Sequence, residues 1–283
     1  MSKQKILLER EQELYEYEGE DKIVSSHELW EELQKTKESV YSLPSGFPSL
    51  ERILGGSEAG ELVVVTGPTG EGKTTLLMSI TKNMAERNIL SAWFTLEVTP
   101  RQFIKKIAPG GKLPLFYVPQ KNAENTLDWI EARIIEAKVK HNIQCVFIDH
   151  IHQIFSLQRS RGNISLEIGD MVAKIKQIAL DQNLVVFLIA HSRDDGQNPT
   201  REPTKEDIRD SGLISRLADT IIGVWRIRNE DDLTVTKRKP LGEMDTKAKV
   251  RVMKNRKTGQ LGTFIAYHQQ HFLTEDAFYG SNI

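Results

Sequence analysis

The chain has 283 residues, of which 39% are hydrophobic and 27% are charged, and its formal net charge is −1. These values suit a globular protein with a hydrophobic core, and the single cysteine, Cys145, excludes a disulfide framework and cysteine-rich zinc sites. No uninterrupted apolar segment is long enough to span a bilayer, and the N-terminus lacks a signal-peptide core. We therefore expect a cytoplasmic protein (phage, bacterial or in an organelle matrix) with no membrane partner.

The N-terminal stretch differs in charge from the rest of the chain. The first 40 residues carry 11 acidic and 6 basic side chains, and two helices are expected there, at 5–18 and 27–38. Their apolar positions are too few to form a core of their own. Two interpretations stay open: a solvated or partly disordered leader, or an arm that docks its apolar face on a neighbouring subunit.

A turn-rich stretch, Pro44-Ser-Gly-Phe-Pro48, divides the chain into an arm at 1–43 and a domain at 44–283. From Glu61 onward, apolar strands alternate with helices. The expected strands are 62–66, 91–96, 144–149, 184–190, 219–225, 249–254 and 261–267. The expected helices lie near 73–86, 99–107, 124–140, 165–182 and 211–217. This alternation predicts an α/β domain whose central sheet is largely parallel and flanked by helices.

The strand at 62–66 runs into a glycine-rich turn that fits G-x-x-x-x-G-K-[ST], and a helix follows. Such a turn directs backbone N–H groups at phosphates, and the helix N-terminus adds partial positive charge. The residues expected to bind the nucleotide are Gly67, Pro68, Thr69, Gly70, Glu71, Gly72, Lys73, Thr74 and Thr75. Lys73 would reach the β- and γ-phosphates, and Thr74 would ligate Mg²⁺. We therefore expect ATP and Mg²⁺ as cofactors, against the alternative of a chance glycine-rich turn.

Two later strands end in carboxylates. Asp149 ends the strand at 144–149 and is placed to hold Mg²⁺ beside Thr74, unless it only marks the return to solvent. Glu97 follows the strand at 91–96 and would orient and deprotonate the attacking water, unless it caps the next helix.

A third strand, at 184–190, is followed by His191, which would hydrogen-bond the γ-phosphate or serve a structural role. A long polar stretch then leads into the helix at 211–217. Its candidates for contact with a nucleic-acid backbone are Arg193, Arg201, Lys205, Arg209, Ser211 and Gly212. A solvated surface loop is the alternative.

Near the C-terminus, Lys254 and Arg256 lie one residue apart at the end of a strand, so strand alternation directs both to one side. They form either an ordinary basic hairpin or a pair of cations inserted into a neighbouring subunit's ATP site, where they stabilise the charge of the transition state.

Taken together, these segments resemble the RecA-like ATPase domain of replicative ring helicases: the DnaB family, phage primase–helicases and mitochondrial Twinkle. The matching stretches are Gly67–Thr75, Phe94–Glu97, Phe147–His150, Leu188–His191, Asp207–Ile222 and Lys254–Gly259. They occur in the family's order over about residues 44–270. A histidine at 191 resembles the phage and Twinkle branch, because bacterial DnaB usually has glutamine there.

The resemblance implies a DNA helicase motor: a homo-oligomer, expected as a hexameric ring, that threads single-stranded DNA and translocates by hydrolysing ATP. It implies that Lys73, Thr74, Glu97 and Asp149 act within one subunit and that His191 senses phosphate. Lys254 and Arg256 would act from the adjacent subunit. Arg226 would pack near the adenine, with Tyr267 close by, and the stretch 193–212 would face the channel.

The chain also departs from the family. We expect no primase module, because one cysteine cannot supply a zinc ribbon, so a primase, polymerase or loader would be a separate partner. Arg216 stands where relatives commonly carry glutamine, and that role is not transferred. Two other functions remain open: a RecA- or RadA-like recombination ATPase, and a KaiC-like regulatory ATPase that does not touch DNA.

Overall fold

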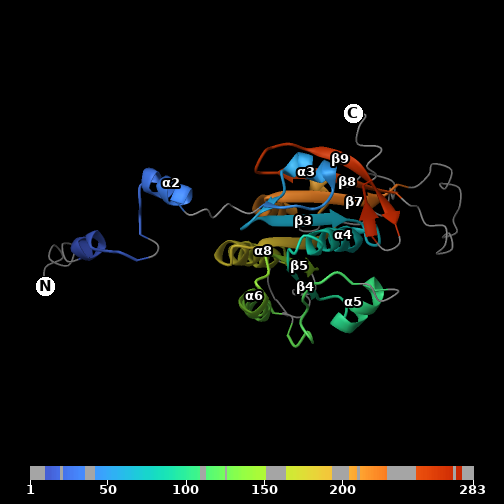
Figure 1. Ribbon diagram of the computed structural model, residues 1–283, viewed down its shortest axis with the longest axis horizontal. Helices are drawn as coiled ribbons and strands as arrows, with labels where there is room; N and C mark the ends of the chain where they lie inside the picture. Colours follow the sequence, from blue (N-terminus) through green and yellow to red (C-terminus); the bar gives the residue numbers. More distant parts are fainter. Residues whose placement is uncertain are drawn as a thin grey trace, which may run out of the picture. The chain divides into compact units, whose positions relative to one another are not determined.

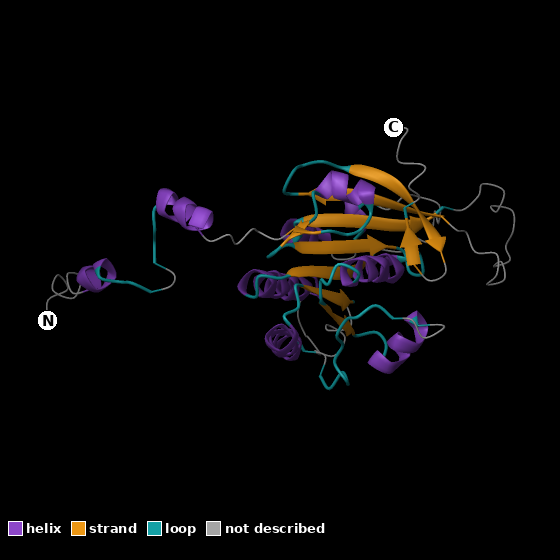
Figure 2. Ribbon diagram, viewed as in Figure 1, coloured by secondary structure: helices purple, strands orange, loops and turns teal. Residues whose placement is uncertain are grey.

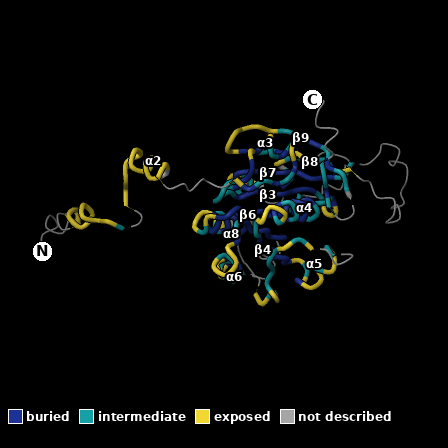
Figure 3. The backbone as a smooth tube through the Cα atoms, viewed as in Figure 1, coloured by how far each residue is buried: buried dark blue, intermediate teal, exposed yellow. Residues whose placement is uncertain are grey.

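The computed structural model describes residues 10–19, 22–35, 42–108, 113–124, 126–150, 164–192, 204–208, 211–227, 247–269 and 272–275. The chain divides into two compact units, residues 1–41 and 42–283. In the first unit, residues 10–15 are helical and α2 spans Ser26–Lys35. Leu29 and Trp30 of α2 are 49% and 62% exposed, and Figure 3 shows the described parts of this unit as mostly exposed. Leu29 and Trp30 are therefore exposed apolar side chains on a charged helix.

The second unit is organised around an eight-stranded sheet with the order β10-β9-β8-β7-β3-β6-β5-β4 (Figure 1). Its strands are β3 (Leu62–Gly67), β4 (Ser91–Thr95), β5 (Cys145–Asp149), β6 (Val185–His191), β7 (Thr220–Arg226), β8 (Lys247–Asn255), β9 (Gly262–Gln269) and β10 (Phe272–Thr274). The helices around it, purple in Figure 2, are α3 (Pro48–Leu54), α4 (Lys73–Ala85), α5 (Pro100–Ile107), α6 (Leu127–His141), α8 (Ile164–Asp181) and α9 (Ser211–Leu217). A 3-10 turn, η1, spans Lys205–Asp207.

Five neighbouring strands, from β7 to β4, are parallel, whereas β8, β9 and β10 are antiparallel to their neighbours. The parallel strands are largely apolar and almost entirely buried, because helices cover both faces of the sheet. Their carboxyl ends meet at one edge, which we call the carboxyl edge. The opposite edge, where β3 and β7 begin, is the amino edge. The predicted α/β class with a largely parallel sheet is confirmed.

Alternate residues of the strands build two different cores. The side chains of Leu62, Val64, Phe94 and Ile148 belong to one buried cluster with residues of α6, α8 and α9. On the opposite face, the rings of Trp93, Phe147 and Phe187 stack with centroids 4.8 Å apart. Trp93 also donates a 3.0 Å hydrogen bond to Thr81 of α4. This helix, which begins with the phosphate-loop lysine, is therefore anchored to the sheet by an aromatic layer.

Two parts of the fold were not predicted. Ser42–Leu43 (β1) pairs with Ser57–Glu58 (β2) in a short antiparallel ribbon, and β10 adds a further strand at the end of the sheet. The backbone N–H of Leu273 in β10 donates a 2.7 Å hydrogen bond to Ser79 of α4.

Among the described residues, no helix combines the length and the apolar character needed to cross a membrane.

Candidate nucleotide-binding site

The phosphate loop joins the buried end of β3 to the start of α4. Gly67 has φ +147°, and a Cβ there would lie 2.1 Å from the backbone oxygen of Val224, so only glycine lets β3 approach β7 so closely. Gly70 and Gly72 have φ +81° and +106°, and a Cβ on Gly70 would meet nothing within 4 Å. The loop therefore keeps conformations that suit glycine around an open space. This geometry fits a backbone cradle for phosphate.

Lys73 lies inside this loop and is only 5% exposed. Its Nζ donates hydrogen bonds of 2.8 Å to the carbonyl oxygens of Gly67 and Pro68. Burial lowers the pKa of Lys73 to about 8, and the carboxylates of Asp149, Glu71 and Glu97 oppose that shift. A buried ammonium that bonds only carbonyl oxygens gains strongly from an anion, so the loop is prepared for phosphate.

Thr74 and Asp149 meet as predicted from the strand order. The Thr74 hydroxyl donates a 2.8 Å hydrogen bond to Oδ2 of Asp149, which is 9% exposed. Burial raises the pKa of Asp149 and the charge of Glu97 adds to the rise, whereas the Thr74 hydrogen bond, His150 and Lys73 oppose it. A cation beside this carboxylate would favour its charged form.

This pair of oxygens fits Mg²⁺, which is usually bound by one or two protein oxygens together with substrate phosphates and waters. No group of three or more His, Cys, Asp or Glu side chains among the described residues is arranged to hold a metal alone. Thr74 and Asp149 are therefore the residues that would hold Mg²⁺, with its other ligands supplied by the nucleotide and solvent.

Glu97 lies two residues beyond β4 and is exposed. Its charge acts on Lys73, Asp149 and His150, so it belongs to the same electrostatic neighbourhood. The alternative of a helix cap is wrong, because Thr99 caps α5 through a reciprocal capping box with Gln102. Glu97 therefore does not cap α5, and its charge acts at the carboxyl edge of the sheet.

His191 ends β6 beside Gly67 in the register of the sheet. Its ring lies edge-to-face on the ring of His150, with centroids 4.1 Å apart and an interplanar angle of 79°. His150 is 6% exposed, and burial lowers its pKa. The sequence alone predicts no role for His150, although its position directly after Asp149 places it near the carboxyl edge.

Glu71 also makes a contact that the loop pattern did not predict. Its carboxylate is buried, and Oε2 accepts a 2.7 Å hydrogen bond from the backbone N–H of Arg226 at the end of β7. The register from β7 through β8 to β9 places Arg226 opposite Ala248 and Lys247 opposite Tyr267, so Arg226 and Tyr267 share the carboxyl edge. The Nζ of Lys247 lies 5.8 Å from the centroid of the Tyr267 ring.

Lys254 and Arg256 lie at the amino edge, because β8 runs opposite to β7 and Asn255 pairs with Thr220. Both side chains reach the carbonyl oxygen of Arg216, Lys254 at 3.3 Å and Arg256 at 2.8 Å. The six residues of β3, about 17 Å of strand, separate this edge from the phosphate loop. The structure therefore does not bring these two cations to the ATP site of their own chain.

The candidate DNA-contact residues are described only in part. Arg193, Arg201 and Arg209 lie outside the described residues. Lys205 and Gly212 are exposed, and Ser211 is the first residue of α9. Ile208 bridges to Ser192, so this segment begins next to the end of β6.

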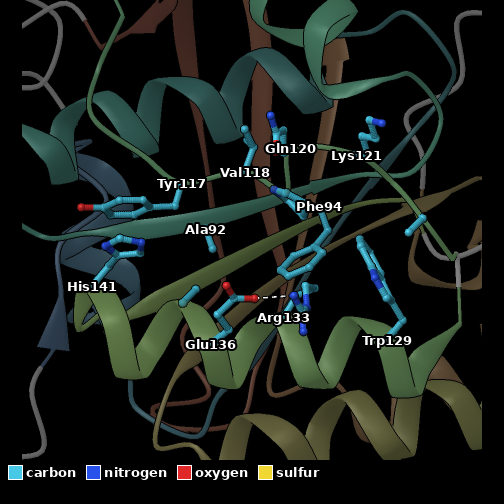
Figure 4. A pocket seen from close by; sticks show the side chains of 13 residues that line it. Ala92, Phe94, Tyr117, Val118, Gln120, Lys121, Trp129, Arg133, Glu136 and His141 are labelled. Atoms are coloured by element: carbon cyan, nitrogen blue, oxygen red, sulfur yellow. Dashed lines mark ion pairs between the residues drawn. The ribbon is translucent and has the colours of Figure 1, made fainter.

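A separate cavity of about 370 Å³ lies between β4, the segment 117–123 and α6 (Figure 4). Phe94 and Trp129 contribute an edge-to-face pair, and Tyr117 stacks on His141 with ring centroids 3.8 Å apart. An ion pair between Arg133 and Glu136 lines it as well, as the dashed line in Figure 4 marks. None of the predicted site residues lines this cavity.

The fold and the carboxyl edge together define a RecA-like P-loop domain, which is the class that the sequence predicted. The family model described as "DnaB-like helicase C terminal domain" matches residues 42–111 and 111–275. The chain belongs to this family.

Curated proteins with similar sequences include replicative DNA helicases. The replicative DNA helicase DnaC of Bacillus subtilis (strain 168) is 25% identical over 235 residues, which cover 73% of this chain and 52% of that protein. The replicative DNA helicase DnaB of Geobacillus stearothermophilus is also 25% identical over 235 residues, with the same shares of the two chains covered. The chain thus spans about half the length of the relatives it matches.

Two solved structures share the fold. A DnaB-like replicative helicase, described with its interactions with primase, has a TM-score of 0.70 at 20% identity and covers 95% of this chain and 71% of that one. A KaiC-like protein from Pyrococcus horikoshii has a TM-score of 0.61 at 18% identity and covers 84% of this chain and 99% of that one. A third structure, described as an ATPase domain, has a TM-score of 0.69 at 18% identity and covers 88% of this chain and 96% of its own.

Proposed function

We propose that this protein is the ATP-dependent motor of a DnaB-type DNA helicase, which moves along single-stranded DNA and unwinds the duplex during replication. The observation that carries the proposal is the pairing of Thr74 with Asp149 at 2.8 Å beside the buried Lys73. Membership in the DnaB-like helicase family supports a motor rather than a simple nucleotide-binding module. We propose the cytoplasm as its compartment.

The chemistry within one subunit follows from four residues. Lys73 exchanges its two loop carbonyls for the β- and γ-phosphates of the substrate ATP, and the N–H groups of the loop bind the phosphate oxygens. Thr74 and Asp149 would hold Mg²⁺, which neutralises phosphate charge when bound. Glu97 orients the attacking water and accepts its proton, a role supported by its position at the carboxyl edge.

Hydrolysis is proposed to require two subunits. Arg256 and Lys254 stand at the opposite edge from their own phosphate loop, so a head-to-tail neighbour is the partner that they can serve. Cations delivered in this way stabilise the transition state. We propose a hexameric ring, in which His191 senses the γ-phosphate and Arg226 and Tyr267 contact the adenine.

DNA is proposed to bind along the segment 193–212. Lys205 is exposed there, and Gly212 leaves room for close approach of a phosphate backbone. The remaining candidates of this surface are Arg193, Arg201, Arg209 and Ser211. The bridge between Ile208 and Ser192 supports a link between this segment and His191. A primase, polymerase or loader would be a separate protein.

The N-terminal unit is proposed to dock on a neighbouring subunit. Leu29 and Trp30 expose apolar surface on an otherwise charged helix, and exposed apolar surface of this kind is typical of a protein–protein interaction site. The arm would then hold subunits together without taking part in the chemistry.

The test is ATP turnover with and without single-stranded DNA, followed by unwinding of a forked duplex, with Lys73→Ala as the inactive control. DNA-stimulated turnover together with unwinding supports the motor. Stimulation without unwinding, with filaments in negative-stain images, would favour a RecA- or RadA-like protein. Turnover that DNA leaves unchanged would favour a KaiC-like regulator.

A further inference from the structure

Asp219 lies between α9 and β7 at the amino edge, and its side chain is 11% exposed. Its two carboxylate oxygens serve different partners. Oδ2 accepts a 2.9 Å hydrogen bond from the backbone N–H of Leu62 and pairs with Lys176 at 2.5 Å. Oδ1 pairs with Nη1 of Arg256 at 3.0 Å. One oxygen therefore secures the carboxylate in the fold, and the other faces the arginine.

Arg256 is held on two further sides. Its backbone N–H donates a 2.9 Å hydrogen bond to the carbonyl oxygen of Asp219, and Nη2 donates one of 2.8 Å to that of Arg216. Its side chain is nevertheless 55% exposed. The guanidinium is thus oriented by the protein while much of its surface remains open to a second chain.

Charge favours an orienting role over a permanent ion pair. Asp219 pairs with two cations, Lys176 and Arg256. Lys254 adds a third positive charge to the cluster and Glu61 a second negative one, so positive charge still exceeds negative charge there. An ion pair with one half-exposed partner holds that side chain only weakly. Arg256 can therefore leave Asp219 for a phosphate, whereas Lys176, which is 18% exposed and also donates a 2.7 Å bond to the Gly60 carbonyl, stays in place.

We propose that Asp219 is a positioning residue for the trans-acting Arg256: it orients the guanidinium in the free subunit, ready for the neighbour's ATP. This inference rests on the proposed function. The same carboxylate fixes Leu62, the first residue of the strand that ends in the phosphate loop. Asp219 therefore contacts two elements. One is Arg256, which would act in the neighbouring subunit, and the other is β3, the strand that leads into the phosphate loop of its own subunit.

The test is Asp219→Asn, which keeps an acceptor oxygen for Leu62 and removes the charge that faces Arg256. We expect kcat of the assembled protein to fall about tenfold, with KM for ATP unchanged within about twofold, because Asp219 lies at the edge remote from its own phosphate loop. In an Arg256→Ala background the same substitution should cause no further loss. Asp219→Glu, which keeps the charge, should recover part of kcat.

Lys257→Met is the matched control, because it removes a neighbouring cation that pairs with Glu58 and leaves the Oδ1–Arg256 pair intact. Its kcat should stay near that of the unaltered chain. If Asp219→Asn unfolds the protein, the comparison of Asp219→Glu with Lys257→Met replaces it. A lower kcat for Asp219→Glu alone then supports the role, and an equal kcat in the two variants contradicts it.

Two outcomes would overturn the inference, and they differ in whether the shared ATP site is refuted as well. An equal loss from Asp219→Asn with and without Arg256 would show that the carboxylate acts elsewhere, while the shared ATP site stands. Unchanged turnover in Arg256→Ala would refute the shared site itself, and the role of Asp219 with it.

Discussion

Glu71 of the phosphate loop is tied to β7 by a 2.7 Å hydrogen bond that the backbone N–H of Arg226 donates to its carboxylate. Gly67, at the start of the same loop, is pressed against Val224 of β7. The loop therefore contacts β7 at two points, Gly67 and Glu71. A carboxylate inside an anion-binding loop repels phosphate, so this contact secures the shape of the loop at an electrostatic cost.

The first prediction separates the support that Glu71 gives to the loop from the repulsion between its charge and phosphate. Glu71→Ala should weaken ATP binding about tenfold, because the partly buried N–H of Arg226 loses its acceptor, at a cost of about 1 kcal/mol or more, and the loop loses its support. Glu71→Gln keeps an acceptor and removes the charge, so it should bind ATP at least as tightly as the unaltered chain. Titration calorimetry checks both, and equal losses in the two variants would contradict this role of the carboxylate.

The second prediction concerns pH. The pKa of Lys73 is lowered to about 8 in the nucleotide-free fold, and phosphate binding favours its protonated form. ATP affinity should therefore be highest below pH 8 and fall above it, by at most about tenfold per pH unit. The dissociation constant measured in EDTA from about pH 7 to about pH 9.5 tests this, because no metal or turnover then contributes.

Lys73→Arg is the control for that titration, since its guanidinium stays charged across the range. The stability of the nucleotide-free fold should change in the opposite sense. Because the pKa in the folded state lies below that of the unfolded chain, about 10.4, the free energy of unfolding should rise between about pH 8 and 10 in the unaltered chain. A flat affinity profile for the unaltered chain would refute the assigned titration.

The third prediction addresses the shared site. Arg256→Ala should reduce hydrolysis in the assembled protein to a small residual rate and spare ATP binding, because the arginine lies far from its own phosphate loop. Mixing Arg256→Ala subunits with Glu97→Ala subunits should restore part of the turnover, since some interfaces then receive both groups. If no mixture regains activity, sharing of the site between subunits loses its support.

The fourth prediction concerns the arm. Deletion of residues 1–40 should lower the mass of the assembly measured by light scattering, because the exposed apolar side chains of α2 would no longer dock. Trp30→Ala should weaken assembly in the same direction, whereas Lys35→Ala on the same helix is the control and should not. An unchanged mass after the deletion would refute docking.

The sheet was largely predictable because each parallel strand is a short apolar run closed by a polar or glycine residue. Thr74 and Asp149 were paired correctly for the same reason, since strand order alone brings them to one edge. The contacts of Glu71 and Asp219 were not predicted. Both depend on distant backbone N–H groups, at Arg226 and Leu62, and no local pattern in the sequence reports such a partner.

The same limit applies to the short ribbon of β1 and β2 and to β10, whose few residues carry no clear alternation. His150 is a different case. It directly follows Asp149 in the sequence, but its contact with His191 depends on the pairing of β5 with β6 and is visible only in three dimensions.

Under the proposed function, the separation of Arg256 from its own phosphate loop gives every subunit a donor side and an acceptor side. An open row of subunits would then always leave one ATP pocket at its end without an arginine and one arginine at the other end without a pocket. Only circular closure matches every pocket with a cation, so turnover per subunit should itself report whether the circle is complete.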